Sequence, residues 1–154
     1  MYEFATCLKR GEAGERFLDE FFAGEFAISP ATRKQQREGI DRIFTKRKTG
    51  SVFRVEYKTD YQAHRTGNAF LETVSVDVEG KKGWVYTSRA DYLIYFVAED
   101  SLIYVVPFKT LRKLFPGWLK KYQQKEVANA SYTSKGICVP LTEFERCAEA
   151  VISA

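Results

Sequence analysis

Near the start of the chain, hydrophobic and polar positions follow a helical period. In GEAGERFLDEFFAGE the apolar or small positions recur at intervals of three and four residues, as expected for one face of an amphipathic helix. These positions are Gly14, Phe17, Leu18, Phe21 and Phe22. A following glycine, Gly24, is a natural helix stop. The pattern predicts a helix over residues 11–24.

The acidic side chains of this helix do not all point the same way. Glu15 has about the same bearing around the helix axis as the apolar Phe22, whereas Glu12, Asp19 and Glu20 point further toward water. Glu15 is therefore the acid expected to lean toward whatever the helix packs on.

The pattern then changes to a period of two, which is typical of strands. A short apolar run, residues 40–44, is followed by the polar stretch TKRKTGS and by VFRVEYKT, residues 52–59. The short polar connection predicts a hairpin. In its second strand, Phe53, Val55 and Tyr57 share one face, and Val52, Arg54, Glu56 and Lys58 share the other.

Further elements complete a mixed pattern. Strands are expected at 69–78, 90–97 and 102–106, and helices at 107–115, from Trp118 onward, and at 140–153 with Thr142 as N-cap. Pro116-Gly117 is expected to break the helical stretch, and the apolar run 90–97 is typical of a strand covered on both sides. We expect an α/β fold with a mixed central β-sheet flanked by helices.

Composition narrows the class of protein. A length of 154 residues with 45% hydrophobic residues predicts one domain, 1–154, with its own core. The three cysteines have no metal-ligand or disulfide spacing, and no apolar leader or membrane-length stretch is present. These features predict a cytoplasmic protein without a membrane partner. The net charge of +4 is too small to predict a polyanionic partner by itself.

The charged positions of the hairpin suggest chemistry. One register places Asp41 directly opposite Glu56, with Cβ atoms roughly 5 Å apart, and pairs Phe44 with Phe53 on the other face. Two carboxylates at that separation can hold Mg²⁺, and Lys58 on the same face would reach a phosphate or an attacking water. The register leaves Arg42 opposite Val55 without an explanation. The alternative is a cross-strand ion pair on an exposed face, which contributes little stability.

These residues resemble a known signature. Asp41, followed by Glu56-x-Lys58 at the end of the next strand, is similar to the D…(D/E)xK motif of the PD-(D/E)xK, or restriction-endonuclease-like, nuclease superfamily. KRGEAGERF resembles the opening of its Holliday-junction-resolvase-like members, in which a glycine precedes a Glu-Arg pair on the first helix. Gly11 and Glu15-Arg16 match that opening. Ile40 stands where a proline is frequent.

The resemblance implies a core at about 10–97, made of a helix, a three-stranded meander, a helix and a further strand. Residues 98–154 would form a hairpin and helical elaboration. It also implies a metal-dependent endonuclease that uses Mg²⁺ or Mn²⁺. Glu15, Asp41 and Glu56 would be the metal ligands, with Lys58 as the fourth catalytic residue. Homing, restriction, junction-resolving and repair enzymes all remain open. The alternative is a catalytically silent nucleic-acid-binding module with the same fold.

Basic and polar segments predict where DNA would lie. The substrate would be double-stranded or branched DNA, and cutting both strands predicts a homodimer or a higher symmetric homo-oligomer. Contacts are expected from the hairpin tip, the polar segment after the motif, a lysine pair and one strand arginine. These residues are Lys46, Arg47, Lys48, Arg54, Gln62, His64, Arg65, Lys81 and Lys82. Solvated surface charges are the alternative for each. Glu72 is either a further acid near the metal or an outward-facing residue of its strand.

Overall fold

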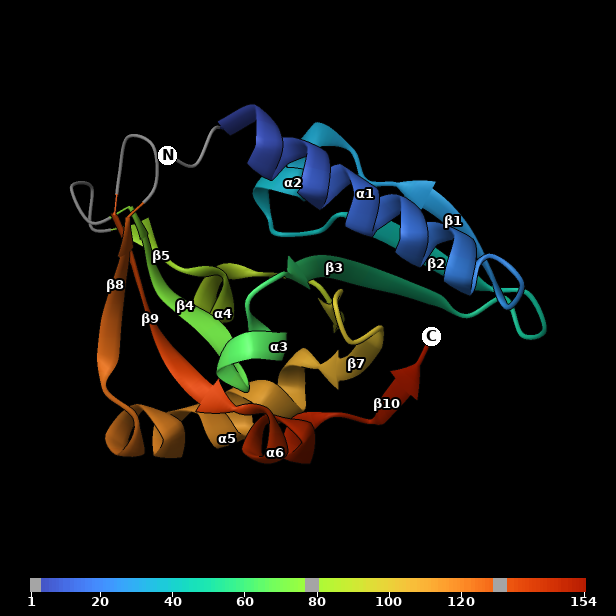
Figure 1. The fold of residues 1–154 in the computed structure, drawn as a ribbon. Helices are drawn as coiled ribbons and strands as arrows, with labels where there is room; N and C mark the ends of the chain where they lie inside the picture. Colours follow the sequence, from blue (N-terminus) through green and yellow to red (C-terminus); the bar gives the residue numbers. More distant parts are fainter. Residues whose placement is uncertain (1–3, 77–80, 129–132) are drawn as a thin grey trace.

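The computed structural model describes residues 4–76, 81–128 and 133–154. In these ranges the chain forms helices and strands in two sheets (Figure 1). The helices are α1 Phe4–Phe22, α2 Arg33–Arg37, α3 Ala63–Thr66, α4 Trp84–Thr87, α5 Phe108–Lys121, α6 Leu141–Phe144 and a 3₁₀ turn at Glu145–Cys147. The strands are β1 Phe26–Pro30, β2 Arg42–Lys46, β3 Val52–Asp60, β4 Asn68–Val76, β5 Lys81–Lys82, β6 Tyr92–Val97, β7 Leu102–Pro107, β8 Gln124–Ala128, β9 Thr133–Pro140 and β10 Ala150–Ser153. The expected α/β class is confirmed.

The central sheet has the strand order β1-β2-β3-β6-β7-β10. It begins as an antiparallel meander of β1, β2 and β3, and β6 then lies parallel to β3. The hairpin β6–β7 and the edge strand β10 continue it in antiparallel fashion. The sheet is therefore mixed, and β3 lies in its interior between β2 and β6.

A second, antiparallel sheet has the order β5-β4-β9-β8. It forms from two segments that are distant in sequence, because β4 pairs with β9 from Asn68 opposite Pro140 onward. Figure 1 shows this sheet on the side of the molecule toward which the carboxyl end of β3 points, with α3 beside it. The second sheet thus brings new side chains to the end of β3.

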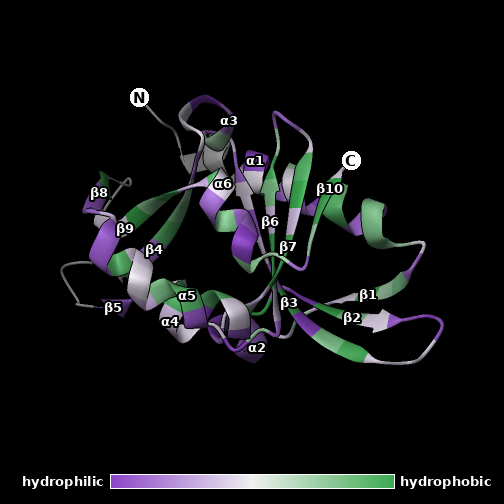
Figure 2. Ribbon diagram, turned by 90° about the horizontal axis from the view of Figure 1, so that it is seen from below, coloured by the Kyte–Doolittle hydropathy of each residue, from purple (hydrophilic) through white to green (hydrophobic). Residues whose placement is uncertain are grey.

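Each face of the central sheet has its own core. Helix α1 buries Leu18 and Phe22 against Phe44, Val55 and Tyr57 of β2 and β3. The opposite face packs on the second sheet and on α3 to α6. Figure 2 shows the hydrophobic residues concentrated in the central strands, which explains why β6 is buried throughout from Leu93 to Val97. The prediction that this strand is covered on both sides is confirmed.

The first helix and the strands at β2, β3, β4, β6 and β7 agree with the sequence predictions, with shifts at some of their ends. The last two positions of the predicted strand 69–78 lie outside the described residues. Two helix predictions are wrong. Helix α5 runs through Pro116 to Lys121, because Leu111, Phe115 and Trp118 bury one continuous face across the proline. The predicted last helix stops after α6 and the 3₁₀ turn, and its end forms β10 against β7. Strands β1, β5, β8, β9 and β10 were not predicted. Because β8, β9 and β10 follow residue 98, that part of the chain is less helical than expected.

Helix α1 approaches β3 through a glycine. A Cβ atom at Gly14 would come within 2.2 Å of the Thr59 hydroxyl oxygen, whereas a Cβ at Gly11 would meet nothing within 4 Å. Gly14 is therefore required by packing, and Gly11 is not.

We expect opposite effects from alanine at these two glycines. Gly14→Ala should lower the free energy of unfolding by roughly 1–3 kcal/mol, because Thr59 and the helix must move apart. Gly11→Ala should raise it by up to about 1 kcal/mol through helix propensity. Urea unfolding of both variants measures the difference, and a stabilised Gly14→Ala would contradict the close packing of α1 on β3.

No helix in the described ranges is long and apolar enough to cross a membrane.

Candidate active site at the β2–β3 hairpin

Asp41 lies immediately before β2 and is fixed to β3 by two hydrogen bonds. Its backbone N–H donates to the Val55 carbonyl at 2.8 Å, and its Oδ2 accepts from the Tyr57 N–H at 2.7 Å. The pairs Arg42–Val55 and Phe44–Phe53 continue the same register. The predicted pairs of Arg42 with Val55 and of Phe44 with Phe53 are confirmed. The regular pairing ends at Arg42, and the Asp41 N–H binds the Val55 carbonyl instead of continuing it to Glu56.

Glu56 is a buried carboxylate in the middle of β3. The residue is only 4% exposed, because its side chain points away from α1 into the second core, beside Leu93 of β6. Glu56 Oε1 lies 3.5 Å from the Lys58 ammonium. Its Oε2 has no hydrogen-bond partner within the part of the chain that the structure describes. A buried oxygen without a partner is costly unless a cation or a proton satisfies it.

The surroundings of Glu56 favour its protonated form. Burial raises the pKa of this carboxyl to about 7. The Lys58 ammonium and the nearby Ser88 hydroxyl oppose the increase, and the nearby Asp41 carboxylate adds to it. Asp41, Glu56 and Lys58 therefore share a site in which Lys58 only partly offsets the cost of burying a charged Glu56.

Lys58 connects this site to the surface. Its ammonium lies 5.6 Å from the centre of the Trp84 ring, within the range of a cation–π interaction. Its side chain is 39% exposed, compared with 6% for Glu56, so that Lys58 can reach both the buried carboxylate and a ligand from solvent. The interpretation of Glu56 and Lys58 as an ion pair on an exposed sheet face does not fit, because Glu56 is buried.

Glu15 lies on the other side of the central sheet from Glu56. Helix α1 packs on the sheet face that carries Val55 and Tyr57. The Glu15 Oε2 atom is 3.7 Å from Arg42 Nη2. Burial raises the pKa of Glu15; Arg42 opposes this and Asp41 adds to it. Asp41 is thus the electrostatic link between the two glutamates, each of whose pKa values it raises.

Arg42 is the residue that sequence reasoning left unexplained. Its guanidinium binds both carboxylate oxygens of Asp19 at 3.1–3.2 Å and the Asp41 carbonyl at 3.0 Å, and it lies 5.4 Å from the Tyr57 ring centre. The Tyr57 hydroxyl donates to the same Asp19 at 2.8 Å. Arg42 faces α1, where its positive charge pairs with Asp19 and Glu15 of that helix. A lone arginine on the apolar face of a strand was the available signal.

The donor set fits a hard divalent cation through two residues. The Asp41 carboxylate lies close enough to Glu56 to raise its pKa, and Glu56 Oε2 has no hydrogen-bond partner among the described residues. Carboxylate oxygens of this kind are ligands that Mg²⁺ prefers. Among the described residues, no three His, Cys, Asp or Glu side chains are grouped closely enough to hold a metal. Glu15 is therefore not brought together with the other two acids.

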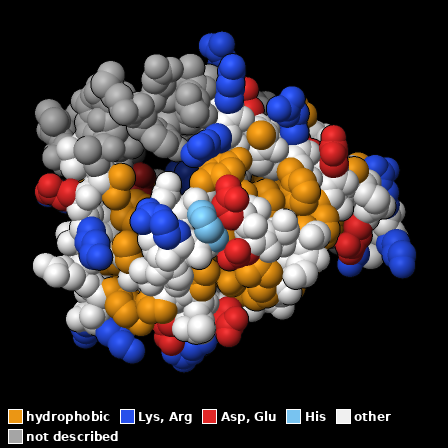
Figure 3. Space-filling model, in the orientation of Figure 1, with side chains coloured by type: hydrophobic (Ala, Val, Ile, Leu, Met, Phe, Trp, Pro, Cys, Tyr) orange, Lys and Arg blue, Asp and Glu red, His pale blue; other side chains and the backbone are white. Residues whose placement is uncertain are grey.

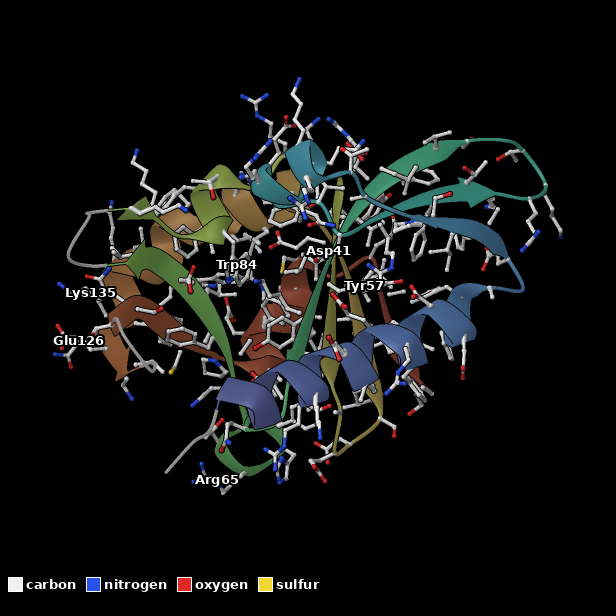
Figure 4. The ribbon with its side chains drawn as sticks, turned by 90° about the horizontal axis from the view of Figure 1, so that it is seen from above. Asp41, Tyr57, Arg65, Trp84, Glu126 and Lys135 are labelled. Atoms are coloured by element: carbon white, nitrogen blue, oxygen red, sulfur yellow. The ribbon has the colours of Figure 1, made fainter. Side chains whose placement is uncertain are left out.

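The predicted DNA contacts separate into distinct regions. Gln62 and Arg65 line a cleft together with Lys58, and His64 is exposed on the same short helix, α3. Figure 4 shows Arg65 at the end of β3 away from Asp41, which lies beside the middle of the strand.

The other candidates lie elsewhere. Lys46 and Arg47 are engaged with Glu25 and with the Ala23 carbonyl, at the hairpin tip opposite the second sheet (Figure 1). Lys48 is exposed at that tip, and Lys81 and Lys82 are exposed on β5. Arg54 pairs with Asp91 at 3.1 Å. Figure 3 shows Lys and Arg spread around the outline of one face, not gathered into a single patch.

Helix α2 carries a basic group that sequence reasoning did not select. Arg33, Lys34 and Arg37 are all exposed on this helix, which leads directly into Asp41. The loop before β6 holds the end of α2, because the Arg89 N–H donates to the Glu38 carbonyl at 2.8 Å. The signal was the segment RKQQR, which has three basic residues in five and ends four positions before Asp41.

Comparison of the chain with protein-family models, with curated proteins and with solved structures gives no match.

Proposed function

We propose that the protein is a Mg²⁺-dependent DNA endonuclease, with Mn²⁺ as a substitute metal. One observation carries the proposal: the buried Glu56 Oε2 has no hydrogen-bond partner among the described residues, while the Asp41 carboxylate acts on its pKa and the Lys58 ammonium lies 3.5 Å from Oε1. A purely structural glutamate at this position would be expected to have both oxygens satisfied.

The roles follow from these positions. Asp41 and Glu56 would hold the metal, and when bound the metal supplies neutralisation of phosphate charge and a more acidic water. Hydrogen bonding from the Tyr57 N–H keeps the Asp41 carboxylate oriented toward β3. Lys58 would orient the attacking water or stabilise negative charge that develops on the phosphate. Glu15 would act through Arg42, which holds the backbone of Asp41.

The order of elements supports the same reading. A first helix, a three-stranded meander, intervening helices and a strand that follows them in the central sheet occur here in the order that the nuclease resemblance implies. In that case β1, β2 and β3 would be the meander, and β4 would belong to an addition.

The partners in this proposal are double-stranded or branched DNA and, for cutting both strands, a second copy of the chain in a homodimer or a larger symmetric oligomer. We expect the enzyme to act in the cytoplasm. The exposed basic residues of α2 would contact phosphates next to Asp41.

A cleavage assay tests the proposal. Purified protein is incubated with supercoiled plasmid and with labelled four-way junctions, in Mg²⁺, Mn²⁺ or EDTA. We expect nicked, linear or resolved products in the metal lanes and none in EDTA. Binding without cutting in every metal lane would favour the catalytically silent module, and its affinity should then fall steeply with salt.

A further inference from the structure

A cleft of about 570 Å³ opens where the carboxyl end of β3 meets the second sheet. Its size lies within the roughly 300–1,000 Å³ that small-molecule sites occupy. One side is formed by Lys58 and the segment after it, including Gln62 and Arg65, and the other by β4, β8 and β9. Lys58 belongs both to this cleft and to the carboxylate site, so that a ligand in the cleft would lie directly beside the site.

Aromatic rings form part of the cleft wall. Phe70, Trp84 and Tyr95 all line it. The Phe70 ring rests against Gly136 of β9, where a Cβ would come within 2.6 Å of the ring. The second sheet therefore supports this ring from one side. Trp84 and Tyr95 are buried, whereas the Phe70 ring is partly exposed. Phe70 is therefore the ring suited to stack with a flat heterocycle.

The polar groups of the cleft suit a nucleobase edge inside and a phosphate outside. Asn68 and Gln62 carry amides that can donate and accept at a base edge, and the Gln62 amide oxygen holds the Arg65 guanidinium at 2.6 Å. Glu72 also lines the cleft, and an acid there disfavours phosphate but can accept from an exocyclic amine. Arg65, exposed on α3, supplies positive charge at the rim.

The acid Asp60 is engaged within the protein. Its Oδ1 accepts from the Gln62 and Ala63 N–H groups at 2.7 and 2.8 Å, and its Oδ2 accepts from the Tyr95 hydroxyl. The Tyr95 oxygen in turn accepts from the Phe70 N–H at 3.1 Å. This chain of bonds joins β3, α3, β4 and β6, so that both sides of the cleft are rigidly connected.

We propose that the cleft binds one unpaired nucleobase of a DNA substrate, stacked on Phe70, while the flanking phosphates contact Lys58 and Arg65. This inference rests on the proposed nuclease function and specifies its substrate class: DNA with an unpaired nucleotide next to the cut, in preference to uniform duplex. A fully paired base could not enter without leaving its stack.

Binding in EDTA tests the inference separately from cutting. Three short duplexes are compared: one with a single unpaired 2-aminopurine nucleotide, one with an abasic residue at that position, and one fully paired. The abasic duplex keeps the backbone distortion but lacks the base. We expect the 2-aminopurine duplex to bind at least about fivefold more tightly than the abasic one, with a change in 2-aminopurine fluorescence on binding.

Phe70→Leu should bring this affinity ratio close to one, since it keeps an apolar side chain but removes the ring. Phe21→Leu is the matched control, because Phe21 is 39% exposed on α1 and lies outside the cleft. Melting temperatures verify that both variants fold. A wild-type ratio near one, or an equal loss of the ratio in both variants, would overturn the inference.

The two proposals fail in different ways. Metal-dependent cutting without any preference for the unpaired base refutes the cleft assignment and leaves the nuclease in place. A clear preference in EDTA without cutting in any metal refutes the nuclease and supports the cleft as a binding site.

Discussion

Lys58→Ala is expected to reduce the cleavage rate by about 10²–10³-fold, the range seen when one charge-stabilising donor is removed from an active site. The Lys58 ammonium is 3.5 Å from Glu56 and reaches the surface through the cleft. Among the described residues, Lys58 is the cation that forms an ion pair with this carboxylate. DNA affinity should fall much less than the rate, because only one phosphate contact is lost. Single-turnover cleavage and DNA binding in EDTA measure the two effects separately.

Asp41→Asn should reduce the cleavage rate at least as much, because it removes the negative charge of a proposed metal ligand. The amide keeps an oxygen that can accept from the Tyr57 N–H, so that the hairpin register is preserved while the negative charge is removed.

Lys120→Ala, a change at an exposed residue of α5, is the control for a general loss of positive charge in Lys58→Ala. If Lys58→Ala cuts as fast as the wild-type protein, the assignment of the site to β3 is wrong.

The positions of the site residues on β3 could be predicted more completely than the surrounding fold, because they depend on the local pattern of apolar and polar residues. Alternation along β3 placed Glu56 and Lys58 on one face, and the short polar turn left few registers, of which the one that pairs Phe44 with Phe53 is observed. Both inferences need only neighbouring residues. The opposite-face position of Glu15 could not be obtained in this way, because it depends on which face of the sheet α1 covers.

The second sheet could not be predicted because its pairing is non-local. Strand β9 carries Gly136, which is poorly suited to a strand except where a neighbouring ring covers it, as Phe70 does here. The segment of β10 continues an amphipathic pattern and was predicted as helix. Its Val151 and Ile152 instead extend the sheet beside β7, where tertiary pairing overrides local propensity. The cleft depends on the second sheet, and so its aromatic wall was not predicted either.

The burial of Glu56 makes the stability of the protein dependent on pH and on metal. The folded protein raises the pKa of this carboxyl to about 7 from an ordinary value of 4.5. The folded state therefore keeps a proton that the unfolded chain releases, and the contribution of Glu56 to stability falls as pH rises from about 4.5 through 7. Without metal, the wild-type protein should lose on the order of 3 kcal/mol across this range because of Glu56.

Glu56→Gln should remove most of this loss, since glutamine stays neutral at every pH. The smaller contribution from Glu15, whose pKa is also raised, would remain. Urea unfolding in EDTA at pH 5 and pH 8 measures the effect. Glu126→Gln is the control: the Glu126 side chain is 67% exposed on β8, beside Lys135 (Figure 4), and its variant should follow the wild-type profile.

The effect of Mg²⁺ on stability shows whether Glu56 is a metal ligand or only a buried acid. If Glu56 binds the metal, Mg²⁺ should restore the stability of the wild-type protein at pH 8, where the carboxylate is charged, and have little effect at pH 5, because only the folded state offers the site. Glu56→Gln should lose most of the response at pH 8. Equal changes in stability from pH 5 to pH 8 in EDTA for the wild-type protein and Glu56→Gln would refute the burial argument. An equal response to Mg²⁺ in both proteins would remove Glu56 from the metal site, and with it the observation on which the nuclease proposal rests.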